Sequence, residues 1–522
     1  MTSRRIPLLF PLLMALTAVG RVQAAPPRLV VNILIDQLRT DYLQAFMPLY
    51  GNDGFRRLME EGLVYSRASA ASAGADRAAT AASVVTGTTP ADHGIVGLRW
   101  LDRQTLRPVG CVDDASTNGV GTREGASPRF LAVSTIGDEL KVATEGQAMV
   151  YAVAPFRDVA VLTAGHAADG ALWIDDVTGH WCTTDYYGTM PAWAVSLDSR
   201  HSPAAQADAV TWQPVSDLVG NFSYFLSGGM KKPFAHKFEG ASRYALFKTS
   251  GLVNAEVTRM ARTCLERTLL GQDALTDYLA VTYYAGNFGH RPANVAPIEL
   301  QDTYVRLDRA VADLVEAVER RVGRERVLFV ITSTGSEDEE TDDLHRYRVP
   351  SGTFDMKRAA ALLNMYFVAV YGQGQYVEGC FGTQFYFNHR LIEERALNMG
   401  EMFNRAQDFL LRMEGVKDVY TADRLLQGAW TPGISRIRAA YNPRYSGDVS
   451  LEIAPGWRVV NAETGENTLI RASYVPFPII FFGYSLPAQT VNTPVTVDCI
   501  APTLSQAMRI RAPNACASAP LF

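Results

Sequence analysis

The chain has 522 residues, of which 48% are hydrophobic and 20% are charged. This is the composition of an ordinary globular protein, and it excludes a disordered, collagenous or coiled-coil chain. The formal net charge of -5 argues against a protein that binds nucleic acid through its charge. The length allows two or three average domains, or one large α/β domain that carries insertions.

The first 24 residues have the three parts of a secretory signal peptide. Arg4 and Arg5 give a positive start, residues 6–20 are mostly apolar, and Ala24 offers a small residue at the cleavage site. The apolar run is too short for a membrane-spanning helix, and no later segment is long enough for one. We expect a periplasmic or secreted protein, cleaved near Ala24 and without a transmembrane segment afterwards; an uncleaved membrane anchor is the alternative.

Three segments have the continuous apolar pattern of strands that are buried on both faces, namely residues 28–35, 326–332 and 479–483. Helical spacing over residues 307–322 precedes the second of them. This alternation predicts an α/β fold with a mostly parallel central sheet and helices on both faces. Residues 170–240, rich in Trp, Tyr, Ser and Pro, lack clear periodicity, and we expect an insertion or cap there.

Several further segments, spread over most of the chain, match one known family in their order. They are VNILIDQLRTDYL (31–43), SVVTGTTPADHGIVG (83–97), TAGHAADGALW (163–173), DTYVRLDRAV (302–311), PIIFFG (478–483) and DCIAPTLSQ (498–506). With them the chain resembles the alkaline phosphatase superfamily, in its type I phosphodiesterase/nucleotide pyrophosphatase and periplasmic phosphomonoesterase-like branch. The resemblance implies one alkaline-phosphatase-like domain over residues 25–522.

The resemblance also implies a specific site, and most of its residues are replaced here. The family holds two zinc ions with three Asp and three His, around a Thr or Ser nucleophile, and Asp36 matches the first Asp. Arg77 stands at the nucleophile position. The other ligand positions that we aligned hold Tyr283, Asn287, Thr334, Gly335 and Asn467. Leu98 replaces an Asn that would bind a phosphoryl oxygen, and Phe156 and Asp158 lie near the positions of a Lys and an Arg.

Asp36 alone cannot hold zinc, which needs about four N, S or carboxylate ligands. A guanidinium cannot act as an alkoxide-type nucleophile, although a register shift of three residues would bring Thr80 to that position. We therefore expect the zinc to be lost, with no catalytic residue and no metal site. We expect Arg77 to neutralise Asp36 in the vestigial cleft; the alternative is that both are solvated and apart.

The remaining polar features give weaker evidence about function. Residues 337–343 (EDEETDD), close to His345, could bind calcium or form a solvated loop. We expect His93 and His166 to be structural, and His290 is the best candidate for a relocated metal ligand.

These observations lead to two hypotheses about function. The first is an exported, catalytically inactive pseudophosphatase that acts as a binding or scaffold protein in the cell envelope. Its partner would be an envelope or secreted protein, a glycan, or a small anion held by Arg77, and not nucleic acid. The alternative is a phosphate- or sulfate-ester hydrolase of the superfamily with a relocated or altered active site. A third possibility is an esterase that uses a Ser or Thr within residues 74–83.

Overall fold

The computed structural model describes residues 25–220, 233–291, 295–335, 350–428, 431–470 and 475–522. The expected signal peptide, the acidic segment 337–343 and His345 lie outside these ranges. Within the ranges, no helix combines the length and the apolar character that a membrane crossing requires.

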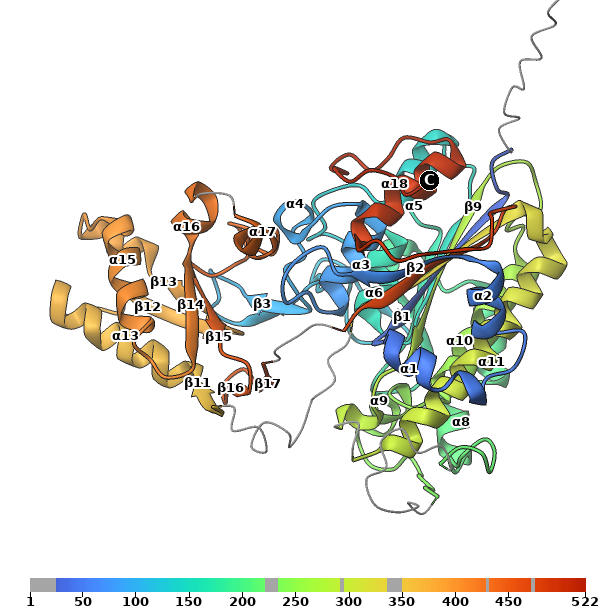
Figure 1. Cartoon of the computed structure of the whole chain (residues 1–522), viewed down its shortest axis with the longest axis horizontal. Helices are drawn as coiled ribbons and strands as arrows, with labels where there is room; N and C mark the ends of the chain where they lie inside the picture. Colours follow the sequence, from blue (N-terminus) through green and yellow to red (C-terminus); the bar gives the residue numbers. More distant parts are fainter. Residues whose placement is uncertain (1–24, 221–232, 292–294, 336–349, 429–430, 471–474) are drawn as a thin grey trace, which may run out of the picture.

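A large twisted sheet of eleven strands forms the centre of the part of the chain that the structure describes (Figure 1). In spatial order its strands are β19 (Gln489–Val491), β2 (Leu63–Ser69), β18 (Phe477–Gly483), β10 (Val327–Ser333), β1 (Leu29–Asp36), β9 (Asp277–Tyr284), β6 (Val150–Val153), β7 (Gly170–Ile174), β8 (Trp181–Thr184) and β5 (Gly119–Val120), with β20 (Val495–Thr496) beside β2. The strands from β10 to β7 are parallel, which confirms the predicted α/β fold. The three predicted strands are β1, β10 and β18, and β18 runs antiparallel to β10.

The apolar run of β1 is continuous because both faces of this strand are covered. All eight of its residues are buried. Side chains alternate between the faces of a strand, so Val31 and Ile33 join the hydrophobic core on one side, whereas Val30 and Leu34 join the core on the other.

Helices cover both faces of the sheet. The first core contains side chains from α1 (Thr40–Ala45), α2 (Phe55–Glu61), α7 (Ala192–Arg200), α8 (Pro203–Ala209), α9 (Arg243–Lys248), α10 (Val253–Arg267) and α11 (Pro297–Val322). The second contains side chains from α3 (Arg77–Thr86), α5 (Ile136–Ala143), α6 (Arg157–Ala164) and α18 (Ile500–Met508). Shorter elements are α4 (Pro90–His93), β3 (Arg99–Leu101), β4 (Pro108–Gly110), η1 (Met47–Leu49), η2 (Asp185–Tyr187), η3 (Phe288–His290), η4 (Arg324–Arg326) and η5 (Val497–Cys499).

A second lobe, formed by the described residues between 352 and 470, stands apart from the central sheet (Figure 1, orange). One of its sheets has the order β12 (Val377–Phe381), β13 (Gln384–Phe387), β15 (Val449–Ile453) and β14 (Val416–Thr421). The other has the order β11 (Gly352–Asp355), β16 (Trp457–Asn461) and β17 (Glu466–Leu469). Its helices are α13 (Met356–Tyr371), α14 (His389–Glu394), α15 (Met399–Leu410), α16 (Ala422–Gln427) and α17 (Pro432–Ala439).

The arrangement differs from the cap that we expected over residues 170–240. Strands β7 and β8 from this range belong to the central sheet, and Trp173 and Trp181 pack into its two cores. Trp173 and Trp181, two of the aromatic residues that suggested a cap, are therefore core residues of the central sheet. The second lobe has a hydrophobic core of its own, which includes Leu363, Phe367 and Phe385.

Candidate functional site

Three elements meet beyond the carboxyl end of β1, where a parallel sheet presents its functional residues. Asp36 is the last residue of β1, Arg77 is the first residue of α3, and Asp158 lies in the first turn of α6. Nη1 of Arg77 donates to Oδ2 of Asp36 over 3.0 Å, so the expected ion pair is present. Nε and Nη2 of Arg77 donate to the two oxygens of Asp158 over 2.8 and 3.1 Å. One guanidinium thus bridges two carboxylates.

Asp36 is held from its other side by Thr334, which follows β10. The Thr334 hydroxyl donates to Oδ1 of Asp36 over 2.7 Å and accepts the backbone N–H of Gln37 over 3.1 Å. Both carboxylate oxygens of Asp36 therefore accept hydrogen bonds, and only 2% of its side chain is exposed.

The start of α3 fixes the position of Arg77. Asp76 caps the helix by accepting the backbone N–H of Ala79 over 3.0 Å, and it also accepts the backbone N–H of Leu98. The guanidinium lies over the ring of Phe156, 4.0 Å from its centre, which adds a cation–π contact. Arg77 is thereby held by a cap, an aromatic face and two carboxylates.

The charges at this site stabilise one another. Burial alone would lower the pKa of Arg77, but the charges of Asp158 and Asp36 raise it well above its ordinary value. Burial likewise acts to raise the pKa of Asp158, and the charge and hydrogen bonds of Arg77 bring it below its ordinary value. The charges of Arg77 and Asp158 therefore persist at neutral pH.

Arg77 keeps part of its hydrogen-bonding capacity. A guanidinium has five N–H donors, and the described residues accept three of them, which leaves one on Nη1 and one on Nη2. About 14% of the side chain is exposed. The site can therefore offer two N–H groups to an oxyanion.

His290, in η3 just after β9, lies within the electrostatic influence of this cluster. Desolvation lowers the pKa of its imidazole, the charge of Asp36 opposes that shift, and the charge of Arg77 adds to it. The imidazole is therefore neutral at neutral pH.

A cavity of about 980 Å³ adjoins the site. Gly74 and Ala75, just before α3, and Gly335, just after Thr334, line one side of it. The second lobe lines the other side with residues that include Tyr420 and Arg436. The second lobe thus forms the far wall of a cleft that reaches the neighbourhood of Arg77.

The structure brings together only some of the residues that we expected at the site. Thr334 contacts Asp36, and Gly335 follows it. The hydroxyl of Tyr283 lies 2.8 Å from that of Thr258 in α10, so its side chain points into the helical layer. Asn467 lies in β17 of the second lobe, where its amide oxygen accepts a hydrogen bond from Arg458.

Asn287 and Thr80, the other positions that we considered, contribute a backbone carbonyl and a buried side chain. Asn287 is buried, and its carbonyl accepts the hydroxyl of Tyr284. Thr80 is fully buried within α3, and its hydroxyl has no partner among the described residues. Thr80 therefore lies in the fully buried part of α3 and not at the start of the helix, where Arg77 lies.

The described residues do not fit two zinc ions at this position. Zinc needs about four N, S or carboxylate ligands, whereas the carboxylates of Asp36 and Asp158 are already bound to Arg77. Among the residues with described positions, no three or more His, Cys, Asp or Glu side chains form a group that could hold a metal.

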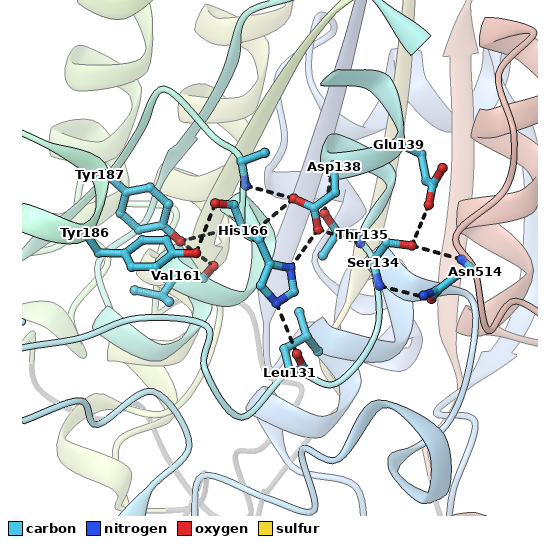
Figure 2. Close-up of polar contacts among 12 residues, drawn as sticks. Leu131, Ser134, Thr135, Asp138, Glu139, Val161, His166, Tyr186, Tyr187 and Asn514 are labelled. Carbon is cyan, nitrogen blue, oxygen red and sulfur yellow. Dashed lines mark hydrogen bonds and ion pairs between the residues drawn. The ribbon is translucent and has the colours of Figure 1, made fainter. Parts of the chain in front are cut away.

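His93 and His166 use both ring nitrogens within the protein. The ring of His93 lies between the Ser83 hydroxyl and the backbone N–H of Ile95, and burial lowers its pKa to about 3. Figure 2 shows the ring of His166 between Asp138 and the carbonyl of Leu131, at 2.8 and 3.1 Å. Tyr186 donates to the carbonyl of His166 from the other side.

Sequence reasoning missed the role of Asp158. A signal for it was present in the resemblance described above, which aligns Arg77 with the family's nucleophile and places Asp158 near an Arg of the monoesterase branch. Such an exchange of charge indicates that the two residues face each other across the cleft.

Known proteins resemble the chain over nearly its whole length. It is 28% identical over 528 residues to the alkaline phosphatase PafA of Elizabethkingia meningoseptica, covering 96% of this chain and 95% of that protein. It is 29% identical to the alkaline phosphatase PhoV of Synechococcus elongatus, covering 94% and 91%. The crystal structure of wild-type PafA superimposes with a TM-score of 0.82 at 25% identity and covers 95% of this chain and 98% of that chain.

These similarities contradict our expectation of a catalytically inactive pseudophosphatase that serves as a binding or scaffold protein. Two relatives that align over nearly their whole length are named alkaline phosphatases, so a phosphoester hydrolase with an altered site fits better. The expectation was wrong because the replaced ligands argue only against the two-zinc arrangement. They do not exclude hydrolysis by other groups in the same cleft.

The family assignment itself rests on a match longer than any single motif. The family model for type I phosphodiesterase / nucleotide pyrophosphatase matches residues 30–474, which include Asp36, Arg77, Asp158 and most of the second lobe. The chain therefore belongs to the type I phosphodiesterase/nucleotide pyrophosphatase family of the alkaline phosphatase superfamily.

Proposed function

We propose that this protein hydrolyses phosphoric or sulfuric esters, with an active site in which Arg77 stands where the family places its nucleophile and metal ions. The observation that carries the proposal is the end-to-end similarity to alkaline phosphatases. The fixed guanidinium beyond the end of β1 supports it, because planar, forked N–H groups suit tetrahedral oxyanions.

In this proposal Arg77 binds the ester oxyanion with the N–H groups that it does not use within the protein. Asp36 and Asp158 are positioning residues, because they hold the guanidinium without contacting the substrate themselves. The leaving group extends into the cleft in front of the second lobe.

Hydrolysis of aryl esters tests the role of Arg77. We expect the protein to release nitrophenol from at least one of nitrophenyl phosphate, bis(nitrophenyl) phosphate and nitrophenyl sulfate. Arg77→Gln should lower kcat/KM about 100-fold, since it removes a charged donor to the transition state. Arg77→Lys keeps the charge but loses the planar fork, so its kcat/KM should lie between those of Arg77→Gln and the unmodified protein.

Arg157→Gln is the matched control, because Arg157 is the neighbouring arginine of α6 and pairs with Asp113 and Glu124 instead. Its kcat/KM should equal that of the unmodified protein. No turnover of any of the three esters would refute the proposed function. Equal activity of folded Arg77→Lys and unmodified protein would refute the role of Arg77.

We also propose that zinc is absent from the position of Asp36, since its donors are engaged by Arg77 and Thr334. We expect less than about 0.1 zinc per chain by elemental mass spectrometry, because a single carboxylate that is already engaged cannot supply the roughly four ligands of a zinc site. Dialysis against a chelator should leave ester hydrolysis unchanged. Zinc near one or two ions per chain, lost together with activity, would contradict this.

The bridge from Arg77 to Asp158 should contribute measurably to stability. Asp158→Asn should lower the free energy of unfolding at pH 7 by about 1.5–3 kcal/mol, because it removes a charged partner from a buried guanidinium. The pKa of Asp158 is lower in the folded protein than the ordinary 3.8, so this contribution is complete above that pH. It should disappear as the pH falls through the folded-state value.

Urea unfolding at pH 7 and at pH 3 measures this difference. The matched control is Asp53→Asn, since Asp53 is exposed, and we expect it to change stability by less than about 0.5 kcal/mol. A difference between Asp158→Asn and the unmodified protein that grows below pH 4 would have the wrong sign.

Finally, we propose that the chain is exported and cleaved after Ala24 to a periplasmic or secreted form. The positive start, the apolar segment and the small residue at the cleavage site support this. After expression in a bacterium with an outer membrane, N-terminal sequencing of the periplasmic fraction should begin at Ala25. Ala24→Asp should leave the precursor uncleaved. An unmodified chain that stays at full length in the cytoplasm would contradict export.

A further inference from the structure

A second cavity, of about 450 Å³, lies between α10 and α11 and is lined by four arginines. Arg259 and Arg262 come from α10, and Arg306 and Arg309 come from α11. We propose that this cavity is a binding site for a phosphate-type oxyanion, separate from the site at Arg77. The class of ligand is inorganic phosphate or a small phosphorylated molecule.

The two helices hold the four arginines in a fixed arrangement. They lie side by side on one face of the sheet (Figure 1). They run in the same direction, since Gly251 lies against Thr303 and the hydroxyl of Thr258 bonds to the carbonyl of Ala310. A Cβ at Gly251 would lie 2.8 Å from Cα of Thr303, so glycine permits this close approach.

Each helix contributes its pair of arginines at a spacing of three residues, which places both on the same helical face. Because the two helices pack closely, these two faces form the walls of one cavity. Four guanidinium groups therefore line a space of limited volume, although the whole chain carries a net negative charge.

Four carboxylates accompany the four arginines, but they engage the guanidinium groups unequally. Arg259 pairs with Glu256 over 2.7 Å, and Arg306 pairs with Asp302 over 2.6 Å. The closest carboxylate to Arg262 is Glu266, at 3.9 Å.

Arg309 makes no ion pair or hydrogen bond with the described residues. Asp313 and Glu266 also line the cavity, one turn beyond the arginines. Arg262 and Arg309, one on each wall, are thus the two of these guanidiniums that make no hydrogen bond with a described residue. In the proposed site, these two guanidinium groups bind one anion from opposite sides.

The chemistry of these donors selects the kind of anion. Forked N–H groups from two guanidiniums match the several oxygens of a tetrahedral phosphate better than a single point charge would. The volume is within the range of small-molecule sites and leaves room for a phosphate and a modest organic group. Thr258 and Thr263 use their hydroxyls within the protein, so the arginines supply the polar contacts.

Isothermal titration calorimetry at low salt tests this site with two probes, inorganic phosphate and adenosine monophosphate. The key variant is the double substitution Arg262→Gln with Arg309→Gln. We expect at least one probe to bind the unmodified protein and to bind this variant at least about tenfold more weakly, since two charged donors are lost. Stronger binding of the nucleotide would identify a phosphorylated organic ligand, and equal binding would identify phosphate itself.

The matched control is the double substitution Arg267→Gln with Arg320→Gln, which removes the same charge from the same helices outside the cavity. It should bind like the unmodified protein, and thermal unfolding should show that both variants are folded. The same titration of Arg77→Gln separates this inference from the proposed function, because binding at the α10–α11 cavity should persist there. Failure of both probes to bind the unmodified protein, or equal loss in the two double variants, would overturn the proposal.

Discussion

The bridge that Arg77 makes between Asp36 and Asp158 is the interaction on which the candidate site depends. It joins the end of β1 to the starts of α3 and α6, and it does so with little exposure to water. A buried charge without a partner is costly, whereas a guanidinium between two carboxylates satisfies all three groups. The bridge therefore fixes the geometry of the strand ends from which any chemistry in this cleft must start.

The bridge also explains how the family fold persists with these replacements. With an Arg at the nucleophile position, the carboxylate of Asp36 gains a positive neighbour that needs no metal ion. Asp158 balances the same guanidinium from α6, and Thr334 supplies a neutral donor at the end of β10. In this network every carboxylate oxygen of Asp36 and Asp158 accepts a hydrogen bond, and two N–H groups of Arg77 stay open to a ligand.

Local patterns in the sequence predicted the central strands, because β1 and β10 are continuous apolar runs that only a doubly covered strand needs. The pair of Arg77 with Asp36 could also be predicted, since a lone buried carboxylate requires a counter-charge. Asp158 could not be found in this way. It lies 81 residues from Arg77, and only the sheet brings the two together. The second lobe was not predicted, because the alternating pattern of β15 indicates a strand covered on one face but does not reveal its pairing with β13 and β14.

The charge of the site bears on which esters it can accept. Two carboxylates and one guanidinium give a local charge of about -1, whereas two zinc ions would make the same cleft strongly positive. Lys248 also lies near the Phe156 ring, with Nζ 5.0 Å from its centre, but Asp176 neutralises its charge. A phosphate monoester carries close to two negative charges at neutral pH, and it would be repelled more than an ester with a single charge. In the proposed function, the electrostatics of Arg77 and its two partners would therefore favour phosphodiesters and sulfate esters over phosphate monoesters.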